Sequence, residues 1–247
     1  MKNSIGFICP YFGTIEKEQY KLWLKSCAAN NTIDFLLFTN DEDALSYDVS
    51  PNVKLIRMSW EECIKLIQRQ FDFELTLAYA YKLCDFRPAF GLIFADYLKE
   101  YGFWGHMDNG DTILGDLRKF ITDDILNTYD KIHIYGHLTL FRNETENNNR
   151  FRIPSKSGMT IEKIFTKDEV ACFDDMYQEA SINRIYKENN FPLLEEVENL
   201  VADILPCNWR FRLAQDKEER ISRVFEWNNG KLYELTAVDG EVSKREI

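Results

Sequence analysis

The sequence has no C-x-x-C pair among its six cysteines, no apolar run near the ~20 residues that a membrane span needs, and no segment typical of a signal peptide. The lack of cysteine pairs argues against a zinc site or a disulfide framework. The cysteines have mostly apolar neighbours and are predicted to be free, buried thiols. We therefore expect a cytoplasmic protein without a transmembrane segment. Contact with the inner face of a membrane stays open, although no basic amphipathic helix argues for it.

Basic residues are also few: 30 Lys and Arg stand against 41 Asp and Glu, which gives a net charge of −11. Because binding to a long nucleic acid needs a basic surface, no nucleic-acid partner is expected. A single diphosphate can still bind where a metal ion or a few local cations neutralise it. The glycine-rich pattern of a P-loop is missing, and no Ser-His-Asp or Cys-His arrangement stands out.

Short apolar runs alternate with amphipathic segments through the first half of the chain. Strands are predicted over residues 5–9, 33–38, 53–58, 103–107 and 131–135, and helices over residues 16–29, 59–70 and 88–102. Ser59 and Glu62 have the spacing of a capping box, and Pro88 suits the first position of a helix. This alternation predicts an α/β fold with a mixed, mostly parallel sheet flanked by helices.

The C-terminal third is predicted to be more helical, with helices over residues 174–187 and 192–202. Residues 142–158 are polar and rich in Asn, which indicates a mobile loop. The sequence Asn228-Asn229-Gly230 is a strong signal for a terminal β-hairpin. Neither a repeat nor a low-complexity linker divides the chain, so a single domain over residues 1–247 is expected.

The apolar run at residues 103–107 ends in an acidic turn, Asp108-Asn109-Gly110-Asp111. In an open α/β sheet, ligands bind at the carboxyl ends of the strands. Mg²⁺ and Mn²⁺ prefer hard oxygen ligands and often join one or two carboxylates to substrate phosphates. The turn therefore predicts a metal site formed by Asp108, Asn109 and Asp111 that would bind a nucleotide diphosphate such as a sugar nucleotide. A solvated Asx turn is the alternative.

Two further segments are candidates for binding the nucleotide. Lys82, Asp85 and Arg87 precede the helix predicted to begin at Pro88, where an anion would be favoured. A surface ion pair with Asp85 as a helix cap is the alternative, and the sequence alone favours it. Residues 10–13 follow the first predicted strand and offer an aromatic ring for stacking and a glycine for close approach to a base or ribose. That second set comprises Pro10, Tyr11, Phe12 and Gly13. A plain strand-to-helix turn is its alternative.

Four titratable residues complete the candidates. His106 and His137 could act as ligands or acid–base groups, or could be structural histidines of the core. Asp174 and Asp175 follow an apolar triplet and could supply a general base toward a sugar hydroxyl. Helix capping is the alternative for the two aspartates.

Several of these segments together resemble the start and middle of a bacterial glycosyltransferase-like family found in capsule and surface-polysaccharide gene clusters. The resemblance covers roughly residues 5–235. It rests on ICPYFG (8–13), LWLKSC (22–27), IDFLLFTND (33–41), KLCDFRPAFG (82–91), FWG (103–105), ILGDLRKF (113–120) and GHLTLFRN (136–143).

The resemblance implies a GT-A fold, with a nucleotide-binding part over about residues 1–120 and an acceptor part over about residues 121–247. It further implies a D-x-D-type motif at Asp108 and Asp111 that holds Mn²⁺ or Mg²⁺ against the diphosphate of a UDP-sugar. Lys82, Asp85, Arg87 and His137 would lie around that donor. The acceptor would be a glycan or a lipid-linked glycan.

The chain departs from the family pattern in two ways. Its D-N-G-D turn is one residue longer than D-x-D, and no histidine follows His137 to serve as a late metal ligand. A C-terminal part of the family pattern would be missing if that ligand lies beyond Ile247. A non-catalytic nucleotide-sugar-binding protein and a metal-dependent phosphohydrolase therefore remain as alternatives.

Overall fold

The structure is a computed structural model that describes residues 2–108, 112–175, 180–195, 202–205, 210–213, 224–238 and 241–246. Its centre is a seven-stranded sheet with the order β3-β2-β1-β4-β6-β5-β7, in which only β6 runs antiparallel to its neighbours. The strands are β1 (Ile5–Tyr11), β2 (Ile33–Thr39), β3 (Val53–Arg57), β4 (Phe103–Met107), β5 (Lys131–Tyr135), β6 (Leu138–Arg142) and β7 (Leu193–Leu194). The predicted α/β class and mostly parallel sheet are confirmed.

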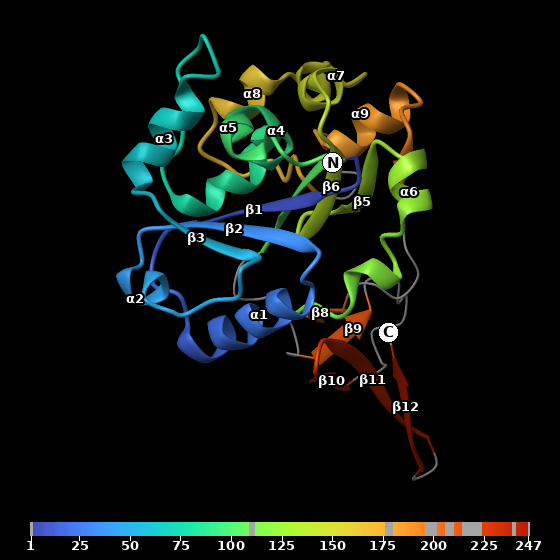
Figure 1. The fold of residues 1–247 in the computed structure, drawn as a ribbon. Coiled ribbons are helices and arrows are strands. Elements are labelled where there is room, and N and C mark those ends of the chain that lie inside the picture. The colour runs from blue at the N-terminus through green and yellow to red at the C-terminus, as the bar shows by residue number, and fades with distance from the viewer. Residues whose placement is uncertain are drawn as a thin grey trace.

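Helices cover both faces of this sheet (Figure 1). One face carries α3 (Trp60–Gln68), η1 (Ala80–Ala89), α4 (Phe90–Ile93), α5 (Ala95–Leu98), α7 (Thr145–Asn149), η3 (Arg150–Arg152), α8 (Ile161–Phe165) and α9 (Ile182–Glu188). The other face carries α1 (Lys17–Ala29) and α2 (Glu42–Leu45), and η2 (Leu117–Lys119) and α6 (Asp123–Thr128) add to the same core. Two apolar cores result, one on each side of the sheet.

The sequence signals at the first helices act as expected. Ser59 and Glu62 form the reciprocal capping box at the start of α3, which satisfies backbone N–H groups that a helix leaves free in its first turn. Glu16 caps α1 by accepting a hydrogen bond from the Gln19 N–H. The first three strands begin at the predicted residues. Strand β1 continues through Pro10 to Tyr11, and β2 and β3 end within one residue of the prediction.

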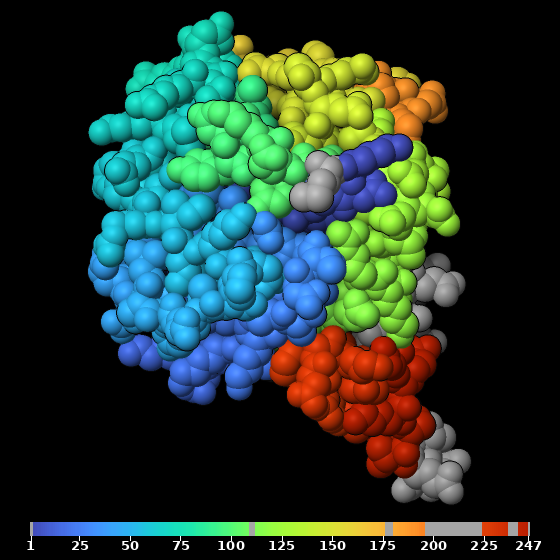
Figure 2. Space-filling view, viewed as in Figure 1, coloured from blue at the N-terminus to red at the C-terminus, as the bar shows by residue number. Residues whose placement is uncertain are grey.

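The C-terminal part forms a separate antiparallel sheet of β10 (Val224–Asn228), β11 (Lys231–Val238) and β12 (Glu241–Glu246), beside a pair formed by β8 (Ala202–Leu205) and β9 (Arg210–Leu213). The predicted hairpin is confirmed. Asn229 and Gly230 have φ angles of 49° and 83°, as a two-residue turn of type I′ requires. Trp227 joins this sheet to the body by donating from Nε1 to the Leu114 carbonyl at 2.8 Å. In Figure 2 the red strands stand out from the body beside the blue α1 region.

Three predicted elements differ in the structure. The single helix over residues 88–102 is wrong, because η1, α4 and α5 divide that segment and Phe94 leaves the helical conformation. The helix over residues 192–202 is wrong where it is described, because it begins as β7 and Ala202 lies in β8. Helix α9 begins at Ile182 rather than at Asp174. Among its described residues, the C-terminal third therefore holds more strand and less helix than expected.

The predicted mobile loop over residues 142–158 is also wrong, because it contains α7 and η3. Its polar residues make specific contacts with the body of the protein. Arg150 pairs with Asp130 at 2.8 Å and lies 3.9 Å from the ring centre of Phe191. Asn147 donates to the carbonyl of Arg142 at 2.7 Å. Polar side chains of the kind that is common in loops thus stabilise the helical turns α7 and η3 here.

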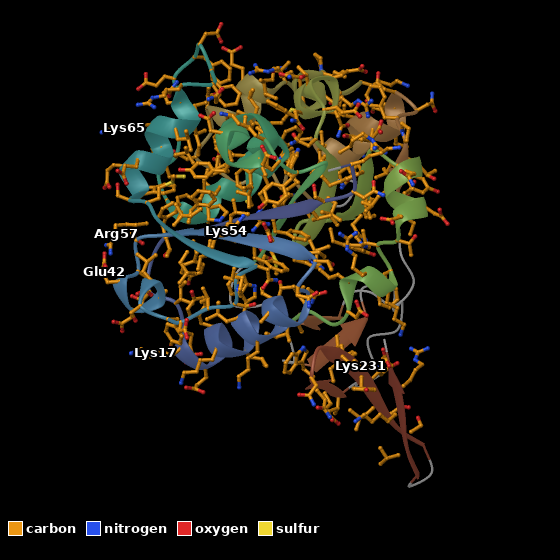
Figure 3. The ribbon with its side chains drawn as sticks, viewed as in Figure 1. Lys17, Glu42, Lys54, Arg57, Lys65 and Lys231 are labelled. Carbon is orange, nitrogen blue, oxygen red and sulfur yellow. The ribbon has the colours of Figure 1, made fainter. Side chains whose placement is uncertain are left out.

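Exposed charges gather at the edge formed by α1, α2 and β3, where Figure 3 shows Lys17, Glu42 and Arg57 pointing outward. Five cysteines are free in the structure, as predicted, and Cys207 lies outside the described residues. Within the described ranges, no helix is long and apolar enough to cross a membrane.

Candidate functional site at the β1–β4 edge

The strand order reverses direction between β1 and β4. From β1 the chain adds β2 and β3 on one side, and then returns to place β4 on the other side. In open α/β sheets the crevice at such a switch point is the usual place for a ligand. Because all strands of this sheet except β6 run in the same direction, the segments that follow β1, β2, β4 and β5 meet at one edge.

The segment after β1 is anchored by the end of β2. The Gly13 N–H donates to Oδ1 of Asn40 at 3.0 Å, and the Ile15 N–H donates to Oδ2 of Asp41 at 2.8 Å. Gly13 has a φ of 131°, a conformation that favours glycine. Phe12 packs against Trp60, with ring centres 5.2 Å apart.

Pro10 and Tyr11 close β1 directly beside these contacts. The Tyr11 hydroxyl donates to the Thr14 carbonyl at 3.3 Å. The predicted base-binding segment, residues 10–13, therefore lies at the switch point in an ordered conformation. Its binding role stays a prediction.

Asp108 follows β4 and lies beside the turn between β5 and β6. Its backbone N–H donates to the His137 carbonyl at 3.1 Å, and its carboxylate pairs with Arg87 through Oδ1. The Asp108 side chain keeps 39% of its surface exposed, which leaves its second oxygen able to meet a cation. Asn109 and Asp111 lie outside the described residues. In the part of the chain that is described, no group of three His, Cys, Asp or Glu side chains gathers as metal ligands would.

Arg87 connects the acidic turn with Asp174. Its Nη1 donates to Oδ2 of Asp174 and to the Gly136 carbonyl, both at 2.8 Å, and its Nη2 faces Asp108. Burial lowers the pKa of Arg87, but the charges of Asp108 and Asp174 outweigh burial and raise the pKa above its ordinary value. Arg87 is therefore a fixed positive charge between two carboxylates at the edge of the sheet.

Asp174 is the most perturbed carboxyl group of the site. Its side chain is 4% exposed, and burial raises its pKa to about 6 although Arg87 acts in the opposite direction. The adjacent Asp175 accepts a hydrogen bond from the Gly136 N–H at 3.0 Å. A carboxyl with a pKa near neutrality is suited to accept or release a proton during a reaction. The alternative that Asp174 or Asp175 caps a helix does not hold for α9, because the N-cap of α9 is Ser181.

Gly136 allows the carboxylate of Asp174 to come close to the backbone after β5, because it has no side chain. A Cβ at this position would lie 2.8 Å from Oδ2 of Asp174, closer than van der Waals contact permits. The sequence pattern did not single out Gly136, although a glycine directly after an apolar strand was a usable signal. Asn40 and Asp41 were likewise missed as the residues that order the segment after β1.

Lys82 and Asp85 lie beneath the site rather than at its surface. Both side chains are 0% exposed and pair at 2.8 Å. Asp85 also accepts from the backbone N–H groups of Ala171 and Phe173 at 2.9 and 3.0 Å. The pair thereby fixes the segment that leads into Asp174. The helix start predicted at Pro88 is wrong, because Lys82, Asp85 and Arg87, which were expected to precede the helix, all lie inside η1. Their roles toward a nucleotide stay predictions.

The histidines are mostly packed into the protein. His137 stacks on Tyr135 with ring centres 5.5 Å apart, and its carbonyl positions Asp108. His106 is 1% exposed in β4, where burial lowers its pKa well below the usual value. Close by, burial lowers the pKa of Lys131 to about 7. Lys131 donates to the His133 carbonyl and is a buried lysine that the sequence did not predict.

The structure thus brings together five of the predicted site residues: Arg87, Asp108, His137, Asp174 and Asp175. The end of β1 is close to them, since the charges of Arg87 and Asp108 act on the buried thiol of Cys9. The result is a sheet edge with one fixed cation, one exposed carboxylate and one buried carboxyl of raised pKa.

Comparison with known proteins gives a family but no activity. No curated protein matches the sequence. A family model described as "Family of unknown function (DUF6625)" matches residues 7–247, nearly the whole chain and every residue of the site. The protein therefore belongs to the DUF6625 family.

Proposed function

We propose that this protein is a metal-dependent glycosyltransferase that moves a sugar from a UDP-sugar to a hydroxyl group of a glycan or lipid-linked glycan acceptor. The observation that carries the proposal is the gathering of Arg87, Asp108 and Asp174 at the β1–β4 switch point. A mixed sheet that reverses at this position agrees with the GT-A fold that the sequence resemblance implies.

The donor would bind along the strand ends. Residues 10–13 would contact the base and ribose, and Arg87 would face the diphosphate, since a guanidinium can donate two parallel hydrogen bonds to phosphate oxygens. Asp108 has the exposure and the oxygen chemistry to hold Mn²⁺ or Mg²⁺, together with Asn109 or Asp111 of the same turn. When bound, such an ion supplies Lewis-acid neutralisation of the charge that develops on the leaving diphosphate.

The protein's own groups would perform the remaining steps. Asp174 would take the proton from the acceptor hydroxyl, whose oxygen bonds to the anomeric carbon as the bond from that carbon to the diphosphate breaks. A pKa of about 6 leaves Asp174 largely ionised at neutral pH while keeping it basic enough to accept the proton. Arg87 would stabilise the negative charge of the departing nucleotide and would hold Asp174 in place.

A thermal-shift panel tests the proposal. Wild type and Asp111→Ala are melted with UDP, GDP, CMP, UDP-glucose or UDP-galactose, each with and without Mn²⁺; Asp96→Ala, on the exposed surface of α5, is the control. A ligand that binds only the folded state raises the melting temperature by mass action. We expect a shift with the uridine nucleotides that needs Mn²⁺, is lost in Asp111→Ala and is kept in Asp96→Ala. No shift with any nucleotide would rule the proposal out.

The non-catalytic alternative is favoured by one observation: Oδ1 of Asp108 is already engaged by Arg87, in a turn longer than D-x-D. Product analysis separates the three functions. A transferase releases UDP from a UDP-sugar and adds the sugar to an acceptor. A binding protein leaves the UDP-sugar intact, and a phosphohydrolase releases inorganic phosphate without an acceptor.

A further inference from the structure

The 3₁₀ helix η1 places three side chains in one row that leads away from the site. In a 3₁₀ helix the residues at i and i+3 eclipse each other. The buried pair of Lys82 and Asp85 shows this period directly, since its partners are three residues apart in η1. By the same period, Tyr81, Cys84 and Arg87 share a second face of η1.

This second face runs from the site to the protein surface. Arg87 contacts Asp108 and Asp174 at its inner end, and Cys84 is buried in the middle. Tyr81 lies at the outer end and is 73% exposed, the highest exposure among the large hydrophobic side chains that the structure describes. Six residues of a 3₁₀ helix span about 12 Å, so a molecule the length of two sugar units can contact both ends of the row.

The pKa of Tyr81 agrees with the direction of this row. Burial and the charges of Cys84, Cys172, Asp108 and Asp174 raise the pKa of Tyr81. Tyr79, which directly precedes η1, is also exposed, and its hydroxyl donates to the Asp168 carbonyl at 3.2 Å.

Tyr81 also stands on a rigid base. In the segment that leads into η1, the Thr76 N–H donates to the Phe165 carbonyl at 2.8 Å, and Leu83 and Phe86 of η1 are buried in the core. An exposed aromatic ring on a rigid support offers a ligand a flat apolar surface that needs little ordering before binding. Such a ring beside polar groups is suited to a ligand with one apolar face and several hydroxyls.

We infer that Tyr81 is a stacking platform for a pyranose ring of the acceptor, at the outer end of the row Tyr81–Cys84–Arg87. This inference rests on the proposed function. The ring is assigned to the acceptor because the row from Tyr81 ends at Arg87, which pairs with Asp174, the group that would take the proton from the acceptor hydroxyl. The apolar C–H face of the sugar would cover the Tyr81 ring, and its hydroxyls would face the carboxylates.

Saturation-transfer NMR tests the inference with the methyl glycosides of glucose, galactose and N-acetylglucosamine, with and without UDP and Mn²⁺. The samples are wild type, Tyr81→Ala, Tyr81→Phe and, as a matched control, Tyr97→Ala, which removes an exposed tyrosine of α5. We expect transfer to the ring protons of at least one glycoside. Tyr81→Ala should weaken that binding roughly 3- to 10-fold, the size of one aromatic stacking contact, whereas Tyr81→Phe and Tyr97→Ala should retain it.

Two results would overturn the platform: equal transfer in wild type and Tyr81→Ala, or no transfer from any glycoside to wild type in either condition. Melting of each variant without ligand shows that it is folded. The UDP–Mn²⁺ shift of the wild type, measured on the same sample, keeps the two proposals apart. A shift without glycoside binding refutes the platform alone, and glycoside binding that depends on Tyr81 without a shift refutes the nucleotide proposal alone.

Discussion

The buried pair of Lys82 and Asp85 gives the sharpest stability prediction, because it supports the segment that presents Asp174. In Asp85→Asn the charge of Lys82 loses its partner while both side chains remain 0% exposed. Removing one member of a buried ion pair costs about 3–5 kcal/mol. The amide would also serve the Ala171 and Phe173 N–H groups less well than a carboxylate does. With a slope of about 2–3 kcal/mol per M, the urea midpoint should fall by roughly 1–2.5 M.

Urea titration followed by circular dichroism measures this effect. The matched control is Glu18→Gln, which neutralises an acidic residue of another i,i+3 pair, with Lys21, that is exposed to solvent. Its midpoint should equal that of wild type within error, because exposed ion pairs are screened by water. A midpoint for Asp85→Asn that also equals wild type would refute the view that this pair holds the segment before Asp174.

Three further predictions concern single groups. If Asp174 is the base, kcat/KM for transfer should fall about tenfold per pH unit below pH 6, its approximate pKa; a flat profile down to pH 4.5 would contradict this role. Lys131→Met should flatten the dependence of the unfolding free energy on pH. Burial lowers the pKa of Lys131 in the folded protein to about 7, below the ordinary 10.5. Between these two pH values the unfolded wild type binds a proton that the folded protein has lost, so the stability of the wild type rises with pH. Parallel stability curves of the two proteins would refute it. Gly91→Ala should lower stability by about 1–3 kcal/mol, because a Cβ there would meet Trp104 Nε1 at 2.4 Å and Asn148 Oδ1 at 2.7 Å; an unchanged melting temperature would show that the contact relaxes freely.

The sequence was most informative where strands end. Asp108 and residues 10–13 each follow an apolar run, and carboxyl ends of parallel strands meet at one edge, so their approach could be predicted without coordinates. The capping box at Ser59 and the Asn229-Gly230 turn were equally readable, since each is determined by a few neighbouring residues.

Contacts between distant segments could not be read in this way. Lys82 and Asp85 resembled surface charges, and only the approach of the segment at Ala171 explains their burial. The helical turns after Arg142 likewise depend on Asp130 and Phe191, which lie far away in the sequence. The 3₁₀ conformation of η1 decides which residues share a face with Arg87, and Tyr81 gained its significance only from that period.

Calorimetric titration of UDP into the protein, with and without Mn²⁺, tests the central claim most directly. Wild type, Asp108→Asn and the surface control Asp96→Asn would be compared, since Asp108 is the described carboxylate of the acidic turn and Asp96 is exposed on α5. The account predicts that UDP binds wild type and Asp96→Asn only when Mn²⁺ is present, and binds Asp108→Asn at least roughly tenfold more weakly, as loss of a charged ligand contact implies. Equal binding by all three proteins, or binding that does not depend on Mn²⁺, would contradict a metal-held nucleotide at the β1–β4 edge.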